Sequence, residues 1–189
     1  MRLQSLKHLL SVIQALASPR KIYLLGSASL LPDRPGLGEP AQPLALTQDG
    51  DFLIEPIDDS LAGMLQEAVG KEALFMEHFG YYADILRPII GEALPVGWES
   101  RLHPVSGYDN VFALDPYDLA LVKLMVGREK DLELLRAMLR LKIVEPERLR
   151  RHYQATPLGE REAQTAGRNL ATVLRESGEE GHGRADPIL

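Results

Sequence analysis

The stretch Lys21-Ile-Tyr-Leu-Leu-Gly-Ser27, together with the later Thr47-Gln-Asp-Gly-Asp-Phe-Leu-Ile54, decides the fold of this chain. The first stretch is short and apolar and stops at Gly26, which predicts a buried strand. The second stretch places Asp49 and Asp51 one residue apart, directly before an apolar run. Side chains at that spacing on a strand point to the same face. We therefore expect a buried strand and a later extended segment that presents two carboxylates on one side.

The acid pair has two interpretations. Gln48-Asp-Gly-Asp51 is typical of a polar turn, because Asp-Gly favours tight hairpins. Alternatively, two carboxylates that converge can hold a hard cation such as Mg²⁺ against a nucleotide phosphate. The earlier Gly26 and Ser27 resemble the strand end of nucleotidyltransferases of the polymerase-beta type, in which the glycine lets backbone approach a phosphate and the serine hydroxyl can bind one. This resemblance favours the second interpretation.

Helical periodicity and chain breakers outline the other elements of the first part of the chain. We expect helices over residues 3–17, 59–69 and 71–79 with a short one over 28–31, a loop over 32–43, extended residues 44–46, and strands over 98–105 and 111–114. Asp58 or Asp59 is suited to cap the second of these helices. The stretch from Gly80 onward, interrupted by Pro88 and Pro95, has no single clear pattern.

The N-terminal segment invites comparison with a secretory signal peptide. Polar residues interrupt its apolar run: Gln4, Ser5, Lys7, His8, Ser11 and Gln14. The leucines and isoleucine recur instead at helical spacing: Leu3, Leu6, Leu10, Ile13 and Leu16. We expect an amphipathic helix and a cytoplasmic protein. No apolar run approaches the length of about twenty residues that spans a bilayer, so no membrane partner is expected.

The pattern becomes helical at Asp115. This residue is a good N-cap, Pro116 suits the first helical position, and Asp118 can interact with the helix N-terminus. Further helices are expected over residues 146–153 and 157–176. The sequence therefore predicts an α/β core over residues 1–114, a helical region over 115–177, and a disordered Gly- and charge-rich tail over 178–189.

The amino-acid composition excludes several classes of function. The chain has 189 residues, a formal net charge of −6 and no cysteine. The absence of cysteine excludes disulfides, thiolate catalysis and thiolate zinc sites. The negative net charge argues against a general nucleic-acid binder, although a local basic patch can still bind an RNA substrate.

Lys123 lies within the apolar run Leu121-Val-Lys-Leu-Met-Val126, where an uncompensated ammonium is costly if buried. Either it extends to solvent or it meets a partner, which is a phosphate or an acid such as Asp118 or Asp131. Lys130 is two helical turns away and shares its face if one helix continues through Gly127. The alternative for both lysines is a solvated edge paired with neighbouring acids.

Two groups of residues carry a resemblance to a known family. Leu24-Leu-Gly-Ser-Ala28 with the later acid-x-acid resembles the motif of nucleotidyltransferases of the polymerase-beta type. The segment from Asp115 to Asp131 resembles the signature of uncharacterised bacterial nucleotidyltransferase-like proteins, which are related to the abortive-infection and type IV toxin–antitoxin nucleotidyltransferases. Phe79-Gly-Tyr-Tyr82 and Leu94 to Leu102 are similar to one branch of that group.

This resemblance covers about residues 21–141 and implies a fold, a reaction and a site. The implied fold is a small mixed α/β (α+β) sheet flanked by helices, with a C-terminal helical extension. The implied reaction is Mg²⁺-dependent transfer of a nucleotide from a nucleoside triphosphate to a hydroxyl of RNA, such as tRNA, or of protein, in a toxin–antitoxin or phage-defence setting. The implied roles place the metal on Asp49 and Asp51, and the nucleotide phosphates on a second set: Gly26, Ser27, Lys123, Arg128 and Lys130.

A third carboxylate is expected to complete such a site and to act as a base. Glu99, on the expected strand over residues 98–105, is preferred, with a salt bridge to Arg101 as its alternative role; Asp84 is the other candidate. The loop over residues 32–43 is longer than the spacer that usually separates the two motifs in that family. Gly50, between the two acids, stands where the family usually has an apolar residue. These departures motivate a second hypothesis, in which a catalytically degenerate member acts as a binding or sensor partner of a protein encoded nearby.

Overall fold

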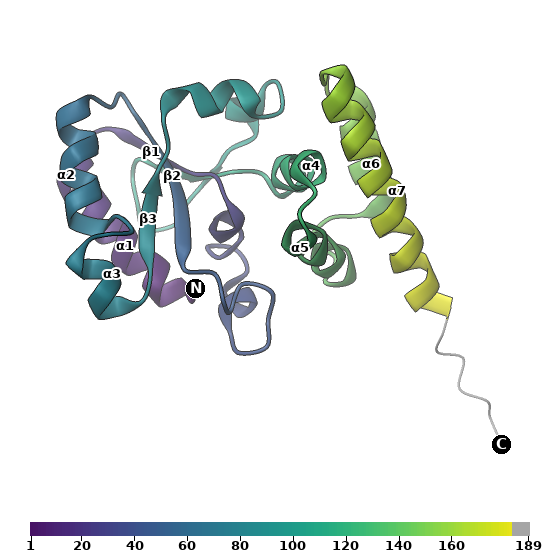
Figure 1. Cartoon of the computed structure of the whole chain (residues 1–189), viewed down its shortest axis with the longest axis horizontal. Coiled ribbons are helices and arrows are strands. Elements are labelled where there is room, and N and C mark those ends of the chain that lie inside the picture. Colours follow the sequence, from purple (N-terminus) through teal and green to yellow (C-terminus); the bar gives the residue numbers. More distant parts are fainter. Residues whose placement is uncertain (183–189) are drawn as a thin grey trace. The chain divides into compact units, whose positions relative to one another are not determined.

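The computed structural model describes residues 1–182, with side chains to residue 178. The chain divides into two compact units, residues 1–115 and residues 116–189. The first unit holds a mixed α/β sheet and the second is helical (Figure 1). This architecture confirms the predicted fold class.

The sheet of the first unit has β1 at its centre. Its strands are β1 (Lys21–Leu24), β2 (Asp49–Glu55), β3 (Tyr82–Ile85), β4 (His103–Pro104) and β5 (Val111–Ala113), in the order β3-β2-β1-β5-β4. β1 runs antiparallel to β2 and parallel to β5. β2 and β3 are parallel, whereas β4 and β5 are antiparallel.

Apolar side chains on one face of this sheet form the core. Ile22 and Leu24 of β1 are buried on that face beside Phe52 and Ile54 of β2, their partners in the ladder. The helices α1 (Leu3–Ala17), α2 (Asp59–Val69) and α3 (Leu74–Phe79) lie together on one side of the sheet (Figure 1). The opposite face of β2 carries Asp49 and Asp51, because side chains alternate along a strand.

Several sequence-based elements are confirmed. α1 spans the predicted residues and buries a helical stripe: Leu6, Leu9, Leu10, Ile13 and Ala17. Asp58 is the N-cap of α2, and its carboxylate accepts a hydrogen bond of 2.8 Å from the backbone N–H of Leu61. Asp58 thus satisfies one of the donors that a helix N-terminus leaves open.

Other predictions were wrong. Residues 98–105 are not one strand: Gly97 adopts φ 77°, a 3-10 helix (Trp98–Arg101) follows, and only His103–Pro104 pairs with the sheet. The alternation of Trp98, Ser100 and Leu102 therefore arose in a helical turn. Residues 44–46 are turns, and the extended element is β2 itself. The ambiguous stretch after Gly80 contains β3.

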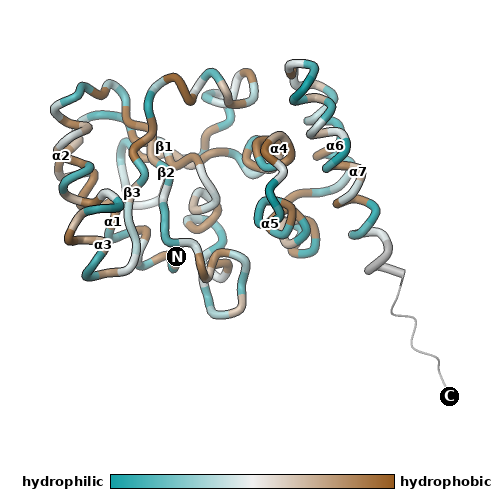
Figure 2. Tube along the Cα trace, in the orientation of Figure 1, coloured by the Kyte–Doolittle hydropathy of each residue, from teal (hydrophilic) through white to brown (hydrophobic). Residues whose placement is uncertain are grey.

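The second unit is built from four helices over its described residues. They are α4 (Pro116–Val126), α5 (Glu129–Arg140), α6 (Pro146–Ala155) and α7 (Glu160–His182). α4 packs against the other three, and Figure 2 shows apolar residues along α4 and mixed polar and apolar residues along α7. α7 extends beyond its expected end near Glu176; residues 183–189 of the expected tail lie outside the described residues. No helix among the described residues is both long and apolar enough to cross a membrane.

Candidate functional site

The end of β1 meets an acid of β2. The backbone N–H of Leu25 donates to the carbonyl oxygen of Asp51 at 2.9 Å. A Cβ atom placed on Gly26 would lie 1.6 Å from Oδ2 of Asp51 and 2.5 Å from its Cγ. The carboxylate of Asp51 therefore occupies the space that any side chain at position 26 would fill. Only glycine is compatible with this arrangement.

Three acidic residues lie on one face of the neighbouring strands β2 and β3. Asp49 and Asp51 are separated by the single residue Gly50 on β2, and their ladder partners on β3 are Tyr82 and Asp84. Partners in adjacent strands of a sheet present their side chains to the same face. Burial raises the pKa of the Tyr82 hydroxyl, and the negative charges of Asp49, Asp84 and Asp51 raise it further. Tyr82 therefore lies close to all three acids on this face of the two strands.

Two serines follow Gly26 in a short 3-10 helix (Ser27–Leu30). Ser27, which the sequence singled out, is partly exposed. Ser29, which it did not, is 4% exposed, and its hydroxyl has no hydrogen-bond partner within the described part of the chain. Buried hydroxyls usually have a partner, so this one has unused capacity for a ligand.

The two departures from the usual motif have structural explanations. A Cβ on Gly50 would lie 2.8 Å from the ring of Phe52, so the space for an apolar side chain at position 50 is already filled. The long spacer is folded: Leu37 and Leu44 are buried, and the N–H of Leu44 donates to the carbonyl of Leu37 at 3.0 Å. Neither departure displaces Asp49 or Asp51 from β2.

Glu99 does not lie on the sheet. It is exposed on the 3-10 helix before β4 rather than on a strand, which corrects the sequence-based placement. Burial raises the pKa of Tyr23 to about 12, and Glu55 and then Glu99 contribute to that rise. Glu55 is four residues from Asp51 along β2, or about 13 Å. Glu99 therefore lies near the opposite end of β2, and Asp84 is the third carboxylate beside the pair.

A comparison with known protein families identifies the family of this chain. The family described as "Nucleotidyltransferase of unknown function (DUF6036)" matches residues 2–171. The chain belongs to this family. No curated protein and no solved structure shows a significant match. Membership in this nucleotidyltransferase family supports the family-level resemblance and a general nucleotidyltransferase role.

Members of a nucleotidyltransferase family are expected to use Mg²⁺, so the donor set has to fit that ion. Among residues 1–182 no three His, Asp or Glu side chains come together as a metal site. Mg²⁺ is, however, usually held by one or two carboxylates, water and substrate phosphates rather than by an all-protein cage. Asp49 and Asp51 on one face of β2 fit that mode of binding, together with the Ser29 hydroxyl after Gly26, which has no hydrogen-bond partner within residues 1–182.

The second unit of this family member holds the cationic residues that the sequence singled out. α4 ends at Val126 because Gly127 adopts φ 67°, and its N–H donates to the carbonyl of Lys123 at 2.9 Å. α5 begins after Arg128, its N-cap. The helix therefore does not continue through Gly127, so the condition under which Lys123 and Lys130 would share a face is not met. Lys130 is exposed on α5.

Asp131 is the centre of an ionic cluster. Nζ of Lys123 lies 3.1 Å from its Oδ1, and Nε of Arg128 lies 2.7 Å from its Oδ2. Asp131 is 1% exposed. Burial alone would raise the pKa of Asp131, but hydrogen bonds from Arg128 and Lys123 outweigh burial and lower it. A carboxylate partner for Lys123 is therefore present, which is the structural alternative that the sequence left open.

Replacing Lys123 with methionine is expected to lower stability. Methionine keeps most of the stem's volume but leaves Asp131 buried with only Arg128 as a partner. The free energy of unfolding should fall by about 1–3 kcal/mol, the cost of an under-satisfied buried group. Chemical denaturation of the two proteins measures this difference. Nucleotide affinity should stay unchanged.

Lys130→Met provides the matched control, since Lys130 is exposed and its loss should change stability little. The lowered pKa of Asp131 sets a pH signature. Its contribution is present above the unfolded-state pKa of about 3.9 and is lost as pH falls through the lower native value. The destabilisation by Lys123→Met should therefore shrink below about pH 4. Undiminished stability together with lost nucleotide binding would instead support a phosphate contact.

Proposed function

We propose that this protein is a Mg²⁺-dependent nucleotidyltransferase, which moves a nucleotide from a nucleoside triphosphate to a hydroxyl of RNA or protein. The observation that carries the proposal is the carboxylate of Asp51 held directly against Gly26 at the end of β1. That contact joins the two halves of the motif, Gly-Ser and acid-x-acid, in one place. Family membership supports the reaction class.

Each residue of the cluster has a distinct role in this proposal. Asp49 and Asp51 hold the metal, which neutralises phosphate charge and orients the attacking hydroxyl when bound. Ser27 and the buried hydroxyl of Ser29 bind phosphate oxygens, and Gly26 allows their close approach. Asp84, beside Asp51 in the sheet, accepts the proton of the attacking hydroxyl.

The acceptor and the biological setting follow from the resemblance and from charge. A tRNA or a protein hydroxyl in a toxin–antitoxin or phage-defence system, with a partner protein encoded nearby, is the proposed setting. With a net charge of −6, an RNA acceptor needs a local basic surface. Lys130 is an exposed candidate for such a contact, whereas the charges of Lys123 and Arg128 are paired with Asp131.

The proposal is tested by incubating the purified protein with labelled nucleoside triphosphates and total tRNA or cell extract, with and without Mg²⁺. Label should move to a macromolecule only when Mg²⁺ is present. The four triphosphates are assayed separately to identify the nucleotide. Equal labelling after the metal is chelated, or none with any triphosphate and acceptor, would contradict the proposal.

A second candidate is a catalytically degenerate member that acts as a binding or sensor partner. It is favoured by the observation that no three metal-ligating side chains come together within the described residues. Calorimetry with nucleotides separates the two candidates. Micromolar affinity that depends on Mg²⁺ favours the enzyme. No nucleotide binding, together with a stable protein complex in pull-downs, favours the degenerate partner.

A further inference from the structure

The turn between α5 and α6 carries a concentration of positive charge. Residues 140–152 hold five arginines and lysines but only two acids, in a chain whose net charge is −6. All five cations are exposed, and one of them, Arg150, lies 3.8 Å from Glu147. The other four have no ion-pair partner within the described residues. We call these four the α5–α6 basic surface: Arg140, Lys142, Arg148 and Arg151.

Lys142 occupies a backbone position that favours glycine. Its φ is 54°, in the left-handed region. The N–H of Lys142 donates to the carbonyl of Leu139 at 3.0 Å, and the N–H of Ile143 donates to that of Met138 at 2.8 Å. These are the two bonds of a Schellman motif, in which glycine is the usual residue at the position of Lys142. The chain thus keeps an exposed ammonium where glycine would be less strained, and strained residues cluster at functional sites.

Arg148 is held by a buried aromatic ring. Its guanidinium carbon lies 4.3 Å from the centroid of the Tyr117 ring. Tyr117 is 7% exposed, and its hydroxyl accepts a hydrogen bond of 3.1 Å from the N–H of Glu145. A guanidinium over an aromatic ring is attracted to it and still has N–H groups that can donate to a phosphate. Arg148 is therefore oriented before any ligand is bound.

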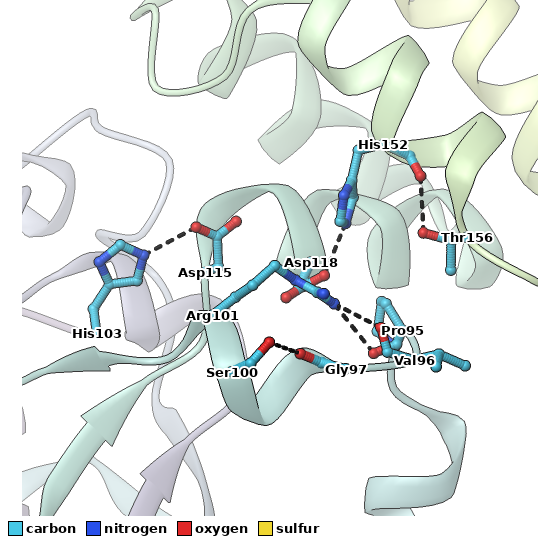
Figure 3. Close-up of polar contacts among 10 residues, drawn as sticks. All are labelled: Pro95, Val96, Gly97, Ser100, Arg101, His103, Asp115, Asp118, His152 and Thr156. Carbon is cyan, nitrogen blue, oxygen red and sulfur yellow. Dashed lines mark hydrogen bonds and ion pairs between the residues drawn. The ribbon is translucent and has the colours of Figure 1, made fainter.

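The contacts of α6 with its own unit leave two arginines exposed on one face. Leu149 is fully buried. Figure 3 shows Nε2 of His152 bonded to Oδ1 of Asp118 on α4, at 2.8 Å. Leu149 and His152 are three residues apart and so share the face that packs inward. Arg148 and Arg151 have the same spacing and share an exposed face.

The phosphates of a nucleic acid fit this surface. Three of its four side chains are arginines, whose planar N–H donors pair well with phosphate oxygens. A protein of net charge −6 needs a local region of the opposite sign to bind RNA. Phosphate contacts here would break no internal ion pair. Arg136, by contrast, is already bound to Glu129 at 2.9 Å and to Glu176 at 2.8 Å.

We infer that the α5–α6 basic surface binds the phosphate backbone of an RNA acceptor. Such contacts position the RNA and carry no information about its base sequence. The choice of RNA rests on the proposed function, which includes an RNA hydroxyl among its acceptors. The surface itself lies wholly within the second unit and needs no nucleotide in order to bind.

The central test is Lys142→Gly, which removes the ammonium and relieves the left-handed backbone. Its melting temperature should equal or exceed that of wild type. Its affinity for labelled total tRNA should fall about fivefold, as expected for one exposed ionic contact. Fluorescence anisotropy without Mg²⁺ or nucleotide measures this affinity. Weaker binding by an equally stable protein excludes unfolding as the cause.

A variant that combines Lys142→Gly with Arg140→Gln, Arg148→Gln and Arg151→Gln tests the whole surface. Its tRNA affinity should fall about a hundredfold or more. The slope of log affinity against log salt concentration should become shallower by about one for each phosphate contact removed. Unchanged affinity and an unchanged slope would overturn the inference.

Lys7→Gln with Lys71→Gln is the matched control, because both are exposed lysines of the first unit. Its tRNA affinity should match that of wild type. Polyglutamate is the probe for an acidic protein partner and should compete with tRNA only weakly. Competition as strong as that of unlabelled tRNA at equal charge concentration would overturn the inference. Because tRNA binding is measured without nucleotide, its failure is distinguished from failure of the labelling assay, which tests the proposed function.

Discussion

Asp51→Asn should reduce nucleotide transfer by roughly a hundredfold or more, and Asp49→Asn should have a similar effect. Asparagine keeps the size of the side chain but removes the negative charge that would hold Mg²⁺. Electrostatic stabilisation by a bound metal is worth several kcal/mol, and each 1.36 kcal/mol is a tenfold change in rate. The measurement is initial rate of label transfer from the preferred triphosphate. Thermal melts confirm that each variant is folded.

Two further variants decide which acid completes the cluster. Asp84→Asn should slow transfer, since Asp84 is the ladder partner of Asp51 on β3. Glu99→Gln should slow it less, since Glu99 lies near Tyr23 and Glu55 instead. Glu92, an exposed acid of the same unit, serves as the neutral control as Glu92→Gln. A larger loss at Glu99 than at Asp84 would reverse the assignment of the third carboxylate.

Gly26→Ala should remove Mg²⁺-dependent nucleotide binding. Its Cβ would lie 1.6 Å from Oδ2 of Asp51, so the carboxylate has to rotate away from the end of β1. Affinity for the triphosphate with Mg²⁺ should drop below detection by calorimetry. The stability cost should be smaller, about 1–3 kcal/mol, because the crowded atoms end a short side chain that can move.

Gly36→Ala is the control for Gly26→Ala, since a Cβ at position 36 meets no atom within 4 Å. Its stability and nucleotide affinity should match wild type within error. The double variant Gly26→Ala with Asp51→Ala isolates the contact. Removal of the carboxylate should recover most of the stability lost by Gly26→Ala, and the coupling between the two sites measures their crowding. Purely additive effects would show that the glycine and the acid do not meet.

The fold was predictable where local patterns and tertiary packing agree. α1 and the cap of α2 followed from apolar periodicity and from Asp58, because both signals lie within a single element. The strand predicted over residues 98–105 was wrong because a 3-10 turn after Gly97 mimics the alternation of a strand over a few residues. β3 was missed because Tyr82–Ile85 is short, and pairing with β2 rather than local propensity determines its conformation.

The candidate site was predictable only in part, for a related reason. Gly26, Asp49 and Asp51 could be named from two local motifs. Their contact, and the position of Asp84 beside Asp51, depend on the register of β1, β2 and β3, which no local pattern contains. Similarly, the apolar run around Lys123 suggested an unusual lysine, but its partner Asp131 is reached only because Gly127 ends α4.

The central place of β1 has a consequence for how the protein acquires its site. β1 forms from residues 21–24, yet its two neighbours come from residues 49–55 and 111–113. Both pairings close long loops, and such non-local contacts form late and cooperatively. A nascent chain that has not yet reached β5 exposes one edge of its central strand. In the proposed function, the contact of Gly26 with Asp51 is therefore a property of the paired strands rather than of any single segment of the chain.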